Sequence, residues 1–275
     1  MQRSNNYIIM FAAAVCVVCS IFVSGSAVSL KEMQKSNQLL DLQKNVISVS
    51  GIFDSPDAVA ALSAEDIEQY FPKDKPDSGK FIQIAYVKIE DGKASLLKDQ
   101  YESPEAYQKA NKGKCKSLSK DLNKPQIRCL PEELMIYLVY DGPNLNRVIY
   151  PVEGKGLWST LKGFLALGKD EKNKGKGYKH IKGLTFYSHA ETPGLGGEVD
   201  NPKWKAQWNG LPAFDESGAI KVKVAKNRAG NEYEVDGLSG ATLTANGVTY
   251  LVQFWLGEKG YGPVIPDIES ISKKL

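Results

Sequence analysis

Histidine is scarce in this chain, which holds only two, His180 and His189, among 275 residues. Neither has a serine or cysteine partner in a pattern typical of hydrolases, so nucleophilic catalysis has no support. Cysteine is also rare, and Cys115 and Cys129 lack the spacing and the histidine or acidic partners of a metal site. We therefore expect neither catalytic residues nor a metal site in this chain.

An excess of charge of one sign is missing as well. The formal net charge is +3, from 35 basic and 32 acidic residues. The basic residues do not gather into a stripe interleaved with aromatic residues, so nothing indicates a nucleic-acid partner. Apolar residues make up 42% of the chain, enough for the core of one large domain or two modest ones.

Charged residues are absent between Ser4 and Leu30. As a helix, residues 7–28 would extend about 33 Å, close to the hydrocarbon thickness of a bilayer. We expect a short cytoplasmic tail at 1–6 and a transmembrane helix at 7–28. A cleaved secretory signal is the alternative, because residues 24–27 are small, although the apolar run is longer than a signal core. Either reading sends the rest of the chain across the membrane.

The short amino tail, rather than flanking charge, gives the orientation. Arg3 precedes the apolar run, whereas Lys31 and Lys35 follow it, and a short tail before a large polar domain favours an internal amino end. We expect a single-pass protein of the cell inner membrane with most of the chain on the periplasmic side. In that oxidising compartment Cys115 and Cys129 could form a disulfide or remain free thiols.

The chain after the apolar run divides into three parts. Apolar residues at helical spacing predict a helical stalk over 29–53. A variable part of helices and loops follows at 54–130. It should hold a helix at 56–70, capped by Asp54 or Ser55, and a strand at 81–89. Its Lys-rich stretch 98–128 is typical of a surface loop with a short helix.

The third part, residues 131–275, alternates short strands with turn signals. Two hairpins are predicted, from 134–140 with 147–152 and from 163–167 with 181–189. Further elements are expected as a helix at 203–208, strands at 220–224 and 232–235, and a helix at 243–256. Strands and helices are segregated, which favours an α+β fold with an antiparallel sheet flanked by helices.

The segment D-G-L-S-G-A-T-L-T-A-N-G-V at 236–248 ends a strand and starts a helix. Gly240 allows an unusual backbone conformation, and Thr242 lies at or just before the helix amino end. Free N–H groups and the helix dipole favour a phosphate there. The alternative is that Ser239 or Thr242 only caps the helix.

Two other glycine-rich segments could approach a ligand. H-A-E-T-P-G-L-G-G-E-V-D-N at 189–201 forms a tight turn with Glu191 and Thr192 at its start. G-K-G-L-W-S at 154–159 could admit a flat ligand covered by Leu157 and Trp158. Each also has a plain structural reading, as an ordinary loop or as a core tryptophan.

Taken together, S-G-A-T at 239–242, H-A-E-T-P-G-L-G-G-E at 189–198 and G-K-G-L-W-S at 154–159 resemble the FMN-binding domain family. With the apolar amino end, the chain is most similar to the NqrC family, the flavin-carrying anchored members of the sodium-translocating NADH:quinone oxidoreductases. The resemblance covers about residues 146–262 and includes Lys44 and Asn45 in the stalk. It fades over 54–128, and the polar linker 169–179 is longer than the family pattern.

The resemblance implies covalent FMN, joined by a phosphoester to the Thr242 hydroxyl by an exported FAD:protein FMN transferase. Residues of the transferase's recognition sequence and of the flavin's surroundings are implied at matching positions. These are Asp236, Ser239, Gly240 and Ala241 for recognition, and Glu191, Thr192, Leu195, Gly196, Trp158 and Ser159 near the ring.

The implied role is that of a membrane-anchored electron-transfer subunit that is not catalytic alone. It would take single electrons from an iron–sulfur centre in membrane partners and pass them to a second flavin, within an NADH:ubiquinone reductase that exports sodium. No motif for NADH or sodium is found in this sequence. The equivalent flavin subunit of an Rnf-type ferredoxin:NAD oxidoreductase is one alternative, and a non-redox anchored binding domain is a remote one.

Overall fold

The computed structural model describes residues 4–72, 74–97, 101, 104–170, 177–226 and 230–275. The chain forms two compact units, Met1–Leu42 and Gln43–Leu275. Helix α1 (Asn5–Ser50) forms most of the first unit and continues into the second, and it is long and apolar enough to cross a membrane. All side chains from 4 to 39 are exposed, as expected of an anchor helix. The predicted span and stalk are one uninterrupted helix, which ends at Ser50 rather than at residue 53.

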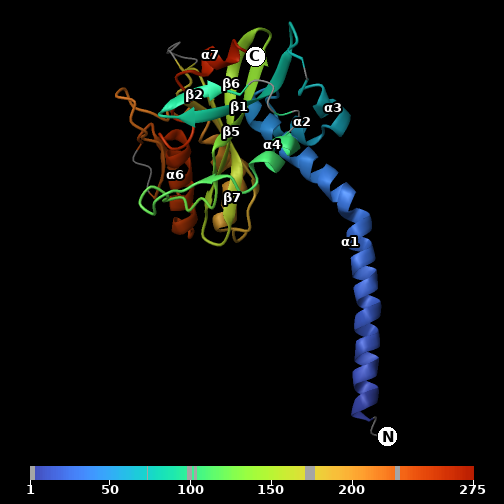
Figure 1. Cartoon of the computed structure of the whole chain (residues 1–275). Helices are drawn as coiled ribbons and strands as arrows, with labels where there is room; N and C mark the ends of the chain where they lie inside the picture. The colour runs from blue at the N-terminus through green and yellow to red at the C-terminus, as the bar shows by residue number, and fades with distance from the viewer. Residues whose placement is uncertain (1–3, 73, 98–100, 102–103, 171–176, 227–229) are drawn as a thin grey trace. The chain divides into compact units, whose positions relative to one another are not determined.

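The second unit is built on a six-stranded antiparallel sheet in the order β2-β1-β5-β6-β7-β8. The strands are drawn as arrows in Figure 1. The sheet consists of β1 (Lys80–Glu90), β2 (Lys93–Leu96), β5 (Glu133–Asp141), β6 (Asn144–Lys155), β7 (Thr160–Gly168) and β8 (His180–Ser188). Both predicted hairpins and the predicted strand 81–89 are therefore confirmed. The α+β class with an antiparallel sheet is confirmed as well.

Strand β1 pairs with β5 along its length, with Lys80 opposite Asp141 and Lys88 opposite Glu133. The sheet thus extends across the expected boundary between 54–130 and 131–275. The pairing is decided by burial, because both strands place apolar side chains in the domain core, among them Phe81 and Leu138.

Helix α6 (Thr242–Leu256) packs against β6, and its apolar face is buried in the core. Trp255 Nε1 donates a 2.8 Å hydrogen bond to the carbonyl of Glu153. A side chain at Gly247 would place its Cβ 2.3 Å from the Lys155 carbonyl oxygen, so only glycine permits this closeness of helix and strand. The amino end of α6 is thereby fixed beside the end of β6.

Three predictions differ from the structure. The predicted helix 56–70 is two helices, α2 (Pro56–Ala60), capped by Ser55, and α3 (Ala64–Glu68). Ser63 and Asp66 form a capping box that starts α3 anew. The strands predicted at 220–224 and 232–235 are β9 (Lys223–Ala225) and β10 (Glu234–Asp236), which pair in parallel and separately from the main sheet. Strand β2 and helix α7 (Ile268–Ser272) were not predicted.

The remaining elements are short. They are α4 (Pro104–Asn111), β3 (Cys115–Lys116), β4 (Leu130–Pro131), the 3-10 helix η1 (Gly196–Asp200) and α5 (Pro202–Ala206). Cys115 and Cys129 form a disulfide, with their Cα atoms 5.0 Å apart. Parts of the stretch 98–128 and most of the linker 169–179 lie outside the described residues.

Candidate functional site

Thr242 is the first residue of α6, and Ala241 is the residue that caps it. No side-chain hydrogen bond caps this helix end, so the alternative in which Ser239 or Thr242 serves as a cap is wrong. Both side chains are exposed, and no hydrogen bond of the Thr242 hydroxyl is found within the described part of the chain. The hydroxyl is therefore available at a helix amino end, where N–H groups lack intrahelical acceptors.

The loop before α6 is held by α5. Trp204 Nε1 donates a 2.8 Å hydrogen bond to the Asp236 carbonyl, and the Asp236 N–H donates a 2.9 Å bond to Gln207 Oε1. Gly240 has φ +68°, the left-handed region that favours glycine. The strand end and the turn are thus fixed, which in turn places Thr242.

Glu191 is the residue that joins the separate segments. Its side chain is only 5% exposed, although it carries a carboxylate. Oε1 accepts hydrogen bonds of 3.0 Å from the Trp158 N–H, the Ser159 N–H and Ser159 Oγ. Oε2 accepts a 3.1 Å bond from the Leu157 N–H and a 2.7 Å bond from Thr244 Oγ1. The carboxylate therefore clamps the 157–159 turn to the start of α6.

Two opposing effects act on the pKa of Glu191. Burial by itself raises this pKa, because it disfavours the charged form. The hydrogen bonds from Thr244 and from the backbone N–H groups of the 157–159 turn lower it, and the net shift is downward. The group is thus ionised at neutral pH, with five donors around a buried negative charge.

Two glycines make room for this carboxylate. A Cβ at Gly156 would lie 2.5 Å from Glu191 Oε1. A Cβ at Gly196 would lie 2.7 Å from Thr244 Oγ1 and 2.9 Å from Glu191 Oε2. Any larger residue at either position would displace the clamp, which gives a physical reason for the glycines in G-K-G-L-W-S and E-T-P-G-L-G-G.

Exposed apolar side chains lie on all three segments of the site. We call them the apolar collar: Leu157 (41% exposed), Trp158 (68%), Leu195 (43%) and Leu243 (60%). Leu243 follows Thr242 on α6, and Leu195 Cδ2 would lie 2.8 Å from a Cβ on Gly240. The alternative of Trp158 as a core residue is wrong. Clustered exposed apolar side chains indicate a surface that binds something.

The loop that carries Leu195 is shaped by its own backbone. The Thr192 carbonyl accepts hydrogen bonds of 3.1 Å from the Leu195 N–H and 2.9 Å from the Gly197 N–H. His189 Nε2 and Asp200 Oδ2 lie 2.6 Å apart and fix the two ends of the loop. Ser159 Oγ also accepts a 2.8 Å bond from the Ala190 N–H, which adds a second link to the 157–159 turn.

The structure thus gathers the three sequence blocks at the amino end of α6. Thr244 and Leu243 are members of this site that the sequence did not single out. Both lie in the motif at 236–248, but spacing could not show which of its side chains faces the clamp. Among the described residues, no group of three or more His, Cys, Asp or Glu side chains is arranged to hold a metal ion.

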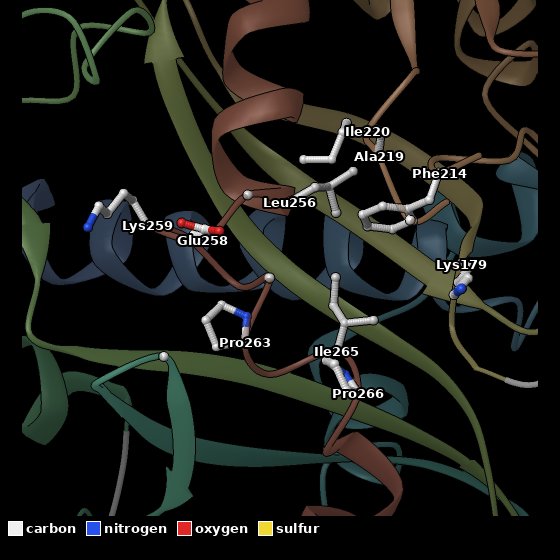
Figure 2. A pocket seen from close by; sticks show the side chains of 14 residues that line it. Lys179, Phe214, Ala219, Ile220, Leu256, Glu258, Lys259, Pro263, Ile265 and Pro266 are labelled. Atoms are coloured by element: carbon white, nitrogen blue, oxygen red, sulfur yellow. The ribbon is translucent and has the colours of Figure 1, made fainter. Parts of the chain in front are cut away.

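A groove of about 830 Å³ lies elsewhere, at the carboxyl end of α6. Figure 2 shows Phe214, Ile220, Leu256 and Ile265 along it, with Lys259 near its rim. None of its lining residues belongs to the predicted site. The candidate site is therefore an exposed ledge around Thr242 rather than this groove.

Comparisons with known proteins agree with the position of the site. The family described as FMN-binding domain matches residues 156–257. The NqrC protein of the Na(+)-translocating NADH-quinone reductase from Vibrio campbellii is 40% identical, over 97% of this chain and 98% of its own length. The protein of the same name from Pseudomonas aeruginosa is 36% identical, over 97% of both chains.

Solved structures show the same fold. The crystal structure of NqrC from Shewanella oneidensis superposes with a TM-score of 0.63 at 24% identity, covering 83% of this chain and 96% of that one. The crystal structure of the corresponding protein from Parabacteroides distasonis gives 0.54 at 22% identity, with coverage of 85% and 96%.

Proposed function

This chain belongs to the NqrC family of the Na(+)-translocating NADH-quinone reductases, and on that premise we propose that it carries FMN joined by a phosphoester to Thr242 Oγ1. The observation that carries the proposal is the exposed Thr242 hydroxyl on the first residue of α6, which caps nothing. A cap would need that oxygen for the helix itself. Here it is available for a covalent bond.

The phosphate of FMN fits the chemistry of this helix end. The first backbone hydrogen bond of α6 is donated by the Ala245 N–H to the Ala241 carbonyl, at 3.0 Å. The N–H groups before Ala245 have no intrahelical acceptor and face the same end as Thr242. A phosphodiester on Thr242 would keep one negative charge beside these donors and the positive end of the helix dipole.

The ring of FMN fits the apolar collar. Leu157, Trp158, Leu195 and Leu243 offer exposed apolar surface from all three segments of the site. Glu191 and Thr244 hold those segments together without presenting a charge to solvent. The ring would then be bound on an open ledge, where a partner protein can approach it.

FMN, when bound, supplies one-electron redox chemistry. The protein positions the flavin. The Glu191 clamp orients the apolar collar, and α1 tethers the domain to the membrane. A tether raises the effective concentration of the site at membrane partners. The chain acts as one member of a complex-level enzyme, and we propose an iron–sulfur donor and a second flavin as acceptor in that complex, with ubiquinone as the final oxidant.

We further propose the cell inner membrane as location, with the second unit on the periplasmic side. The apolar α1 and the disulfide of Cys115 with Cys129 support this, because disulfides persist in oxidising compartments. An exported FAD:protein FMN transferase would attach the flavin there, and Asp236, Ser239, Gly240 and Ala241 would form its recognition sequence. The shared name of the relatives favours this role over the ferredoxin-dependent alternative.

Intact-mass analysis tests the proposal. The full chain is coexpressed with an active flavin transferase, beside Thr242→Ala and Thr242→Ser. A mass increase corresponding to FMN less one water is expected in the wild type and the serine variant, and not in the alanine variant. Thr249→Ala, which removes a hydroxyl farther along α6, serves as the control and should still carry FMN. An increase that survives Thr242→Ala would refute the assignment.

A further inference from the structure

The disulfide-closed loop 115–129 has no role in the site described so far. Its neck is the two-residue pair of β3 and β4, with Cys115 opposite Pro131 and Lys116 opposite Leu130. The disulfide of Cys115 with Cys129 closes the loop at this neck. Cys115 is exposed, so the bond lies within reach of solvent.

The tip of the loop contacts the strand that leads into the flavin site. The Lys155 N–H donates a 2.7 Å hydrogen bond to the Pro125 carbonyl. Lys155 is the last residue of β6, and the next residue, Gly156, starts the turn whose N–H groups bind Glu191. A displacement of Pro125 would therefore act on that turn through a single residue.

Pro125 also packs into the seam between β6 and α6. It is buried, and a Cβ at Gly154 would lie 3.1 Å from Pro125 Cβ and 3.0 Å from Leu251 Cβ. Ile127, two residues farther along, is 6% exposed and belongs to the domain core. The loop thus inserts two apolar side chains beneath the elements that form the site.

The tip has a defined shape that its surroundings must maintain. Asn123 braces it from both sides, accepting a 2.7 Å bond from the Ile127 N–H and donating a 2.9 Å bond to the Ile127 carbonyl. Gln126 has φ +51°, a left-handed conformation that is uncommon outside glycine. Such a conformation persists only where neighbouring structure imposes it, and functional sites are a frequent place for it.

From these contacts we infer that loop 115–129 is a buttress that positions the 156–159 turn of the flavin site, and that its disulfide keeps the buttress in place. The functional half of this inference rests on the proposed flavin role. Opening the disulfide restores conformational freedom to the loop, because the closed neck is what limits its excursions. The bond from Lys155 to Pro125 then becomes intermittent, and Trp158 loses its fixed position.

Opening is a two-electron reduction. The bond between the two Sγ atoms breaks, an added dithiol delivers two electrons and two protons, and the dithiol becomes a disulfide itself. The double variant Cys115→Ser with Cys129→Ser reproduces the open loop without a reductant. The double variant Cys16→Ser with Cys19→Ser is the matched control, since those cysteines are free and lie in α1.

Amide hydrogen exchange on the full chain in detergent, without flavin, is the first readout. We expect the Lys155 N–H and the 157–159 amides to exchange at least about tenfold faster in the open-loop variant, because local opening replaces a closed contact. Asn123→Ala should give the same local pattern with the disulfide intact. Amides of β7 should not change, and the control variant should match the wild type.

The second readout is the flavin itself, in chain loaded by the transferase. The visible circular dichroism of bound, oxidised flavin should weaken in the open-loop variant, and not in the control variant. An unchanged Lys155 amide in both loop variants would overturn the inference, and so would a uniform increase across the sheet, which indicates global stability only. A local increase in the loop variants, together with a wild type that takes up no FMN from an active transferase, would support the buttress and contradict the proposed function.

Discussion

Thr244 Oγ1 donates a 2.7 Å hydrogen bond to Glu191 Oε2, across 53 residues of sequence. The same carboxylate accepts hydrogen bonds from the N–H groups of the 157–159 turn. One buried charge therefore unites three segments that are separate in the sequence. Because each of its donors would be left unsatisfied without it, Glu191 is central to the site although it faces away from solvent.

Glu191→Gln should destabilise the domain and reduce flavin loading. The amide NH₂ would face backbone N–H groups, and at least one buried donor would lose its acceptor. We expect the free energy of unfolding to fall by about 1–3 kcal/mol. Thermal unfolding of the full chain and intact mass after coexpression with the transferase measure the two effects. Glu258→Gln, on an exposed residue, is the control; equal behaviour of the two variants would contradict the clamp.

The free energy of unfolding should depend on pH in part through the ionisation of Glu191. Its pKa in the folded protein lies below the ordinary value of 4.5, so the unfolded chain binds the proton first as pH falls. The contribution of Glu191 is complete above about pH 4.5 and is lost as pH falls through the lowered pKa. Its titratable neighbour is His189, whose Nδ1 accepts the Glu191 N–H.

The pKa values of other carboxylates are lowered as well, that of Glu269 by Lys169 and that of Asp215 to about 2, chiefly by its hydrogen bond from Ser217. The difference between wild type and Glu191→Gln isolates the clamp. We expect that difference in melting temperature to shrink as pH falls below about 4.5, through the lowered pKa of Glu191. A difference independent of pH would show that Glu191 does not contribute as a charge.

Trp158→Ala should affect flavin binding and not folding. The side chain is 68% exposed, so its removal should change the free energy of unfolding by less than about 0.5 kcal/mol. In a Thr242→Ala background, affinity for free FMN should weaken about fivefold, the equivalent of about 1 kcal/mol for an aromatic contact. Titration of the protein into free FMN, followed by flavin fluorescence, measures this affinity. Leu39→Ala, at a residue 43% exposed in α1 and outside the site, should leave the affinity unchanged.

Gly247→Ala should destabilise the protein although it lies inside a helix. Replacing glycine by alanine in a helix interior normally raises the free energy of unfolding by about 1 kcal/mol. Here the new Cβ would lie 2.3 Å from the Lys155 carbonyl oxygen, a backbone atom that cannot rotate away. We expect a loss of about 1–3 kcal/mol from overpacking. Asn246→Ala, on the exposed face of α6, should be neutral or stabilising in the same thermal unfolding assay.

The sequence predicted the two hairpins and α6 well, because local apolar patterns and turn residues determine those elements. It did not predict the break between α2 and α3, where the capping box of Ser63 and Asp66 restarts the helix inside a continuous helical pattern. It also did not predict the parallel pairing of β9 with β10. These two strands are close in sequence, but their parallel direction is set by burial and tertiary contacts rather than by a local turn.

The sequence by itself determined the long apolar helix, the α+β class and the identity of the three site motifs, since apolar length, periodicity and glycine placement are local properties. Only the tertiary structure decided that Glu191 is a buried clamp rather than an exposed ligand residue, that Trp158 lies on the surface, and that Pro125 reaches Lys155. The physical reason is that a hydrogen bond or a buried contact depends on which distant atoms the fold brings within a few ångströms. That information exists only once the chain is packed.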